Sequence, residues 1–82
     1  MIVKIGWVFN MIRYQIYDMR GNEITILSNS KLYKDILQWF SENVGEVDYD
    51  RPIISYVMFE KNEDYNLFRL MFEGRCKLIL QD

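Results

Sequence analysis

The segment from Ser30 to Gly45, SKLYKDILQWFSENVG, decides the fold, because it carries the clearest periodic pattern in the chain. Its apolar residues recur at intervals of three and four, and polar residues fill the opposite arc. This spacing predicts an amphipathic helix over residues 31–44. Ser30 is placed to cap the first turn, and Gly45 to end the helix in a left-handed conformation. The apolar set comprises Leu32, Tyr33, Ile36, Leu37, Trp39, Phe40 and Val44.

Strand patterns lie on both sides of this helix. Residues 2–9 alternate with apolar side chains on both faces, which is typical of a central strand. Residues 12–17 and 24–27 alternate on either side of a glycine-containing turn, and so predict a β-hairpin. A polar loop is expected over residues 46–51. The segment 53–60, IISYVMFE, follows as another strand.

One segment of the carboxyl-terminal third is open to two interpretations. Residues 65–72 fit a helical spacing and also alternate as a strand would. Their aromatic content, and a turn at residues 73–75 before the alternating segment 76–80, favour a hairpin. Together the elements predict a single α+β domain over residues 1–82. In it one helix packs on a mostly antiparallel sheet of about five strands, in two layers.

Composition limits the class of protein. Of the 82 residues, 50% are hydrophobic and 16% aromatic, which is more than one small core can bury. Surplus apolar side chains are therefore expected at an interface, in a homodimer or with another partner. A single cysteine, Cys76, excludes an intramolecular disulfide and indicates a reducing compartment. The amino-terminal segment has neither a signal-peptide cleavage site nor the length of a membrane span, so we expect a cytoplasmic protein without membrane association.

Few residues could support catalysis. The chain contains no histidine, which removes the commonest general base and metal ligand. Cys76 alternates with Leu78 and Leu80 on the expected buried face, which indicates an inert core thiol. The carboxylates at 46–50 and 63–64 lack the glycine and distal glutamate of a calcium loop, so a solvated loop is favoured. We therefore expect no enzyme activity, no cofactor and no metal site.

Negative charge is concentrated in one region. Residues 42–64 contain seven acidic and two basic residues, whereas the rest of the chain is net positive. This distribution predicts a negative patch that binds a basic protein surface. A purely solubilising surface is the other interpretation. The predicted partner-binding residues are Glu46, Asp48, Tyr49, Asp50, Glu63, Asp64 and Tyr65.

A second set of residues suits nucleic acid. Basic and aromatic side chains on one sheet face would bind phosphates and stack on bases. The formal net charge of −2 disfavours this as the main role, and cross-strand packing would also explain the residues. The predicted face consists of Arg13, Tyr14, Arg69, Arg75 and Lys77, with Arg20, Tyr17 and Phe68 nearby.

The general character of the chain matches one class of proteins. It is small and acidic, lacks catalytic residue types, contains no alanine and is rich in residues with AT-rich codons. In these respects it is similar to small phage and mobile-element proteins that inhibit host defence, anti-CRISPR proteins among them, although no shared motif is involved. The similarity implies stoichiometric inhibition of a nucleoprotein complex in a bacterial host. The leading prediction is thus a non-enzymatic binder or inhibitor, and a small nucleic-acid-binding module is the alternative.

Overall fold

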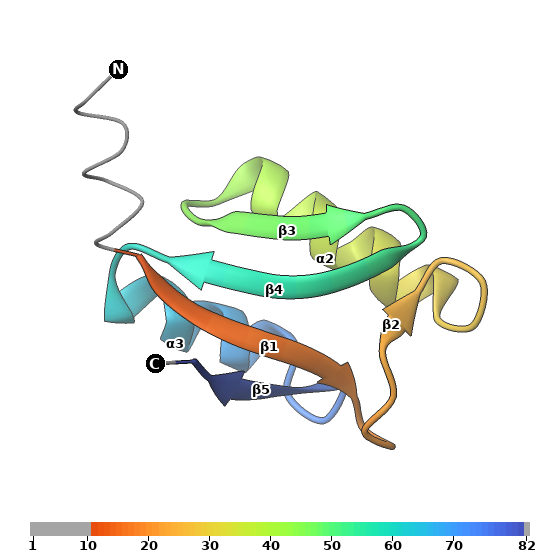
Figure 1. Cartoon of the computed structure of the whole chain (residues 1–82). Helices are drawn as coiled ribbons and strands as arrows, with labels where there is room; N and C mark the ends of the chain where they lie inside the picture. The colour runs from red at the N-terminus through yellow and green to blue at the C-terminus, as the bar shows by residue number, and fades with distance from the viewer. Residues whose placement is uncertain (1–10, 82) are drawn as a thin grey trace.

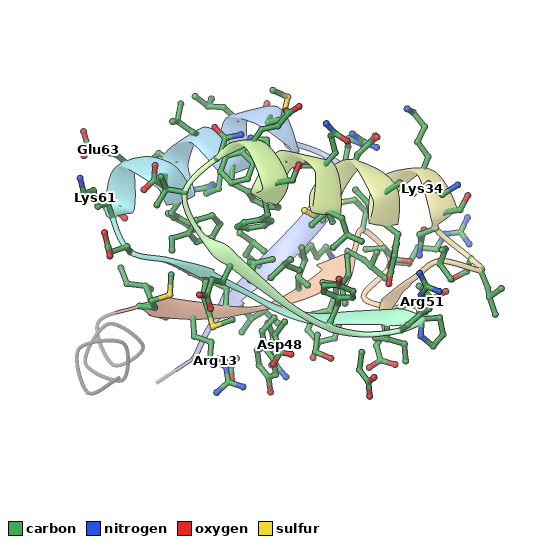
Figure 2. All side chains as sticks on the ribbon, turned by 90° about the horizontal axis from the view of Figure 1, so that it is seen from above. Arg13, Lys34, Asp48, Arg51, Lys61 and Glu63 are labelled. Atoms are coloured by element: carbon green, nitrogen blue, oxygen red, sulfur yellow. The ribbon has the colours of Figure 1, made fainter. Side chains whose placement is uncertain are left out.

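A computed structural model of the protein describes residues 11–81. They form two helices packed on one face of a five-stranded antiparallel sheet (Figures 1 and 2). The predicted two-layer α+β class is confirmed, with two helices in place of one. The strand predicted over residues 2–9 lies outside the described residues. The strands are β1 (Ile12–Asp18), β2 (Ile24–Thr25), β3 (Glu46–Asp50), β4 (Ile53–Phe59) and β5 (Cys76–Leu80), and the helices are α2 (Ser30–Glu42) and α3 (Asn62–Met71).

β4 is the strand around which the sheet is built. It pairs with β3 along one edge and with β1 and β2 along the other, and β1 pairs in turn with β5. β3 and β5 are therefore the outer strands of the sheet that residues 11–81 form (Figure 1).

The hairpin predicted for residues 12–17 and 24–27 is wrong. β1 and β2 follow one another along the same edge of β4, and Ile24 pairs with Ile54. The turn between them does form, because the Asp18 carboxylate accepts hydrogen bonds from the backbone amides of Arg20 and Asn22. After this turn the chain continues beside β4. With seven residues, β4 is long enough to pair with both β1 and β2.

α2 confirms the predicted helix with different ends. Ser30 is its first residue, and Asn29 occupies the cap position without a side-chain cap bond. The helix ends at Glu42, and the Asn43 side chain donates to the Trp39 carbonyl. Gly45 has a φ of +145° but lies beyond the helix. A Cβ there would be 2.7 Å from the Phe40 ring and 2.9 Å from the Met58 carbonyl oxygen, so glycine is needed for a close approach to β4.

Two segments differ in type from their prediction. Residues 46–50 form strand β3 where a loop was predicted, because pairing with β4 satisfies the backbone groups along one of its edges. Residues 65–72, for which a strand was favoured, belong largely to helix α3. Phe68 of α3 and its C-cap residue Phe72 are both buried, a spacing of four that suits a helix. β5 therefore pairs with β1 and forms no hairpin with residues 65–72.

Three aromatic rings connect the two layers. The ring centre of Trp39 on α2 lies 6.3 Å from that of Phe59 on β4 and 5.2 Å from that of Phe68 on α3. All three residues are buried. In the part of the chain that is described, no helix is long and apolar enough to span a membrane.

Candidate interaction surface

Three carboxylates form a row on the outer strand β3. Glu46, Asp48 and Asp50 pair with Met58, Tyr56 and Ile53 of β4, which alternate with the buried residues of that strand. The three carboxylates, called the acidic row below, therefore lie on the sheet face away from the helices. Figure 2 shows Asp48 on this side. All three are exposed, and both ion pairs formed by residues 11–81 involve Asp35, so no described cation neutralises the row.

The sheet face away from the helices, called the open face below, changes in character from one edge to the other. Next to the acidic row lie Tyr56 and Met58, both partly exposed. The guanidinium carbon of Arg13 on β1 sits 3.9 Å from the centre of the Tyr56 ring, a cation–π contact. Lys77 and Ile79 of β5 occupy the far edge. The face thus runs from negative through aromatic to positive.

The predicted partner-binding residues are divided between two sides of the molecule. Glu63 and Asp64 belong to the first turn of α3, where their negative charges interact favourably with the positive end of the helix dipole. Figure 2 places Glu63 in the helix layer, opposite Asp48. Tyr65 stacks on Tyr14 with ring centres 4.5 Å apart.

Tyr49 projects to the helix side of β3, beside a hollow lined by Leu37, Phe40 and Val47. It is 49% exposed. Of the seven predicted residues, the structure brings together on the open face only the three of the acidic row.

The predicted nucleic-acid face is divided as well. Tyr14 and Phe68 are buried in the core, and burial raises the pKa of Tyr14. Arg69 lies on α3 above Tyr65. Arg75 donates a 2.8 Å hydrogen bond to the Asp35 carboxylate on α2 and so holds the pKa of that carboxyl below its usual value.

Only Arg13, Tyr17 and Lys77 remain on the open face, while Arg20 belongs to the turn after β1. Sequence reasoning missed Tyr56 as their aromatic neighbour. Its alternation with Val57 and Phe59 in the predicted strand was the available signal.

Burial or backbone hydrogen bonding explains the pKa shifts of two further groups. Burial raises the pKa of the Cys76 thiol to about 11. Backbone hydrogen bonds from Asn22 and Arg20 lower the pKa of Asp18, which closes a turn. Among residues 11–81, no three acidic or cysteine side chains are grouped as metal ligands would be. The side chains on the open face offer charge, hydrogen bonding and apolar contact.

Each outer strand is flanked by a depression on the helix side. Beside β3 is the hollow that Tyr49 borders. Beside β5, beneath α3, is a groove of about 1120 Å³ that is lined on the helix side by Phe68, Arg69, Phe72 and Leu78 and that reaches around the outer edge of the strand to Lys77. No family model, curated protein or solved structure matches this chain.

Proposed function

We propose that this chain is a non-enzymatic interaction protein that binds a basic surface of a larger protein or nucleoprotein complex through its open face. The acidic row supplies the charge, and Tyr56 and Met58 supply apolar contact. In this role it acts in the cytoplasm of a bacterial host as a stoichiometric inhibitor, as phage or mobile-element anti-defence proteins such as anti-CRISPRs do. A partner that normally holds nucleic acid would present the basic surface that the acidic row fits.

The acidic row is the observation that carries this proposal. Three exposed carboxylates on alternate residues of one strand create a local negative field that the described residues do not neutralise. Such a field speeds association with a positively charged partner and disfavours partners of the same sign. Aromatic and methionine side chains beside it are the residue types enriched in protein interfaces.

Charge reversal tests which acidic residues bind the partner. The double variant Glu46→Lys, Asp48→Lys is expected to lose capture of a partner from bacterial lysate, with the salt dependence of capture reduced as well. The matched control is Glu63→Lys, Asp64→Lys, which changes the net charge equally but in the helix layer. Quantitative mass spectrometry of the captured proteins measures both, and circular dichroism checks that both variants fold.

Equal loss of capture in both double variants would show that net charge alone matters and would contradict the proposal. The functional readout is phage plating on CRISPR-immune bacteria that express each variant. The proposal expects plating to rise with the wild-type chain and with the control, and to stay low with Glu46→Lys, Asp48→Lys.

A nucleic-acid-binding module remains the second candidate, because Arg13 stacks on Tyr56 and, farther along the same face, Tyr17 pairs with Lys77. Such a platform could stack bases and contact phosphates. The acidic row beside Tyr56 opposes it by repelling phosphate. A mobility-shift assay with single-stranded DNA and RNA at low salt separates the two functions, since only the second candidate expects a shift that Arg13→Ala removes.

A further inference from the structure

The two outer strands carry opposite charges on the same face of the sheet. β3 presents the acidic row on the open face, and β5 presents Lys77 there. No strand formed by residues 11–81 pairs with the outer edge of either. We propose that copies of this chain associate head to tail, with β3 of one copy pairing with β5 of the next. The sheet would then continue from molecule to molecule.

The directions of the strands permit this pairing. In the order β3, β4, β1, β5 each strand is antiparallel to its neighbour, so β3 and β5 run in opposite directions. A second copy displaced sideways, without being turned over, therefore brings its β3 antiparallel to β5 of the first. Both strands have five residues. The helices of both copies then lie on the same side of the joined sheet.

Charge favours this pairing over the symmetric one through β3. Directly opposed residues of an antiparallel pair have Cβ atoms about 5 Å apart, so opposite charges there stabilise the pair and like charges destabilise it. Joining β3 to β5 places Lys77 beside the acidic row. Joining β3 to a second β3 would place two acidic rows side by side. The charges therefore select the head-to-tail arrangement.

The helix side of the two strands is complementary as well. Tyr49 of β3 is half exposed and lies on the helix side. Among the apolar residues that line the groove beside β5, Leu70 and Leu78 are accessible. In the joined sheet, the Tyr49 ring of one copy would enter the groove of the next and pack on these two leucine side chains. The contact is heterologous, so it does not close on itself in a dimer.

Light scattering after size exclusion, across a range of protein concentrations, tests the proposal with the full chain. The average mass of the wild type is expected to rise with concentration and to fall with added salt. The variant Lys77→Glu is expected to associate at least about tenfold more weakly, because it places a carboxylate beside the acidic row. Lys34→Glu, an exposed change on α2, carries the same change in charge and is expected to behave as the wild type.

A mixing experiment identifies the surfaces involved. At a concentration where the wild type begins to associate, Lys77→Glu and the double variant Glu46→Lys, Asp48→Lys are each expected to be monomeric alone. Their mixture is expected to associate, because each retains one native edge and their altered edges are also complementary. A wild type that stays monomeric at all concentrations overturns the proposal, and so does association that Lys77→Glu leaves unchanged. Partner capture by Lys77→Glu is expected to persist, because the proposed contact uses the acidic row, Tyr56 and Met58 at the other edge of the open face, so this proposal and the proposed function can fail separately.

Discussion

Cys76 shows at the scale of one residue how burial controls chemistry. It begins β5 and packs against the core on the helix side of the sheet. Burial raises the pKa of its thiol from the ordinary value of 9.0 to about 11, and outweighs the opposite effect of the Arg75 charge. The thiolate is the reactive form of cysteine, so Cys76 should be a poor nucleophile at neutral pH.

We expect native Cys76 to react with a thiol reagent at pH 8 about 100-fold more slowly than an exposed cysteine, because so little of it is ionised. The same shift affects stability. The unfolded thiol ionises near pH 9 and the folded one near pH 11, so its contribution to stability is complete below pH 9 and is lost as pH rises toward 11. Reaction rates of native and denatured protein across this range measure the shift. A native rate that reaches its half-maximum below pH 9 would contradict it.

The role of Gly45 could be predicted from the sequence only in part. A glycine after an amphipathic segment indicates a change of chain direction, and this occurs. Glycine is needed at position 45 for a different reason from the predicted helix cap. The Phe40 ring and the Met58 carbonyl occupy the space that a side chain would need. Met58 is distant in sequence, so this constraint arises only once β4 lies against the end of α2.

At the scale of elements, the periodicity of apolar residues located the helices and strands that have one clearly apolar face. α2, β4 and β5 agree with their predicted positions to within a few residues. β3 was missed because its three acidic residues are typical of a loop, and only its pairing with β4 makes it a strand. The alternation of the acidic row was visible in the sequence. The sequence does not show that the acidic row and the pair Glu63 and Asp64 lie on opposite sides of the sheet, because the fold topology determines on which side each segment lies.

Alanine substitutions in α3 distinguish a helix from a strand over residues 65–72. In a strand, Phe68 and Leu70 would share a face, whereas in α3 Phe68 is fully buried and Leu70 is 72% exposed. Phe68→Ala is therefore expected to lower the free energy of unfolding by about 3–5 kcal/mol, and Leu70→Ala by less than about 1 kcal/mol. Urea denaturation measures both. Comparable large losses in the two variants would support the strand.

At the scale of the whole molecule, covering one sheet face with two helices determines where the surplus apolar residues lie. Composition predicted that such residues would be exposed, but their positions depend on the packing. Six of the nine large apolar residues that are exposed among residues 11–81 lie on α3 and on the outer strands, and Tyr49, Leu70 and Ile79 among them line the groove or the hollow there. The large apolar residues exposed there are Tyr49, Leu67, Leu70, Met71, Ile79 and Leu80.

The fold as a whole depends on Trp39, because its ring contacts Phe40, Phe59 and Phe68 and so joins both helices to the sheet. Trp39→Asp removes this ring, at a cost of about 3–5 kcal/mol, and adds the cost of burying a carboxylate without a partner, several kcal/mol more. A domain of this size is stable by only about 4–12 kcal/mol. We therefore expect Trp39→Asp to be unfolded at 25 °C by circular dichroism, while the exposed change Lys34→Asp keeps a cooperative thermal transition. A melting temperature equal to the wild type in Trp39→Asp would mean that α2 does not pack on the sheet through this residue.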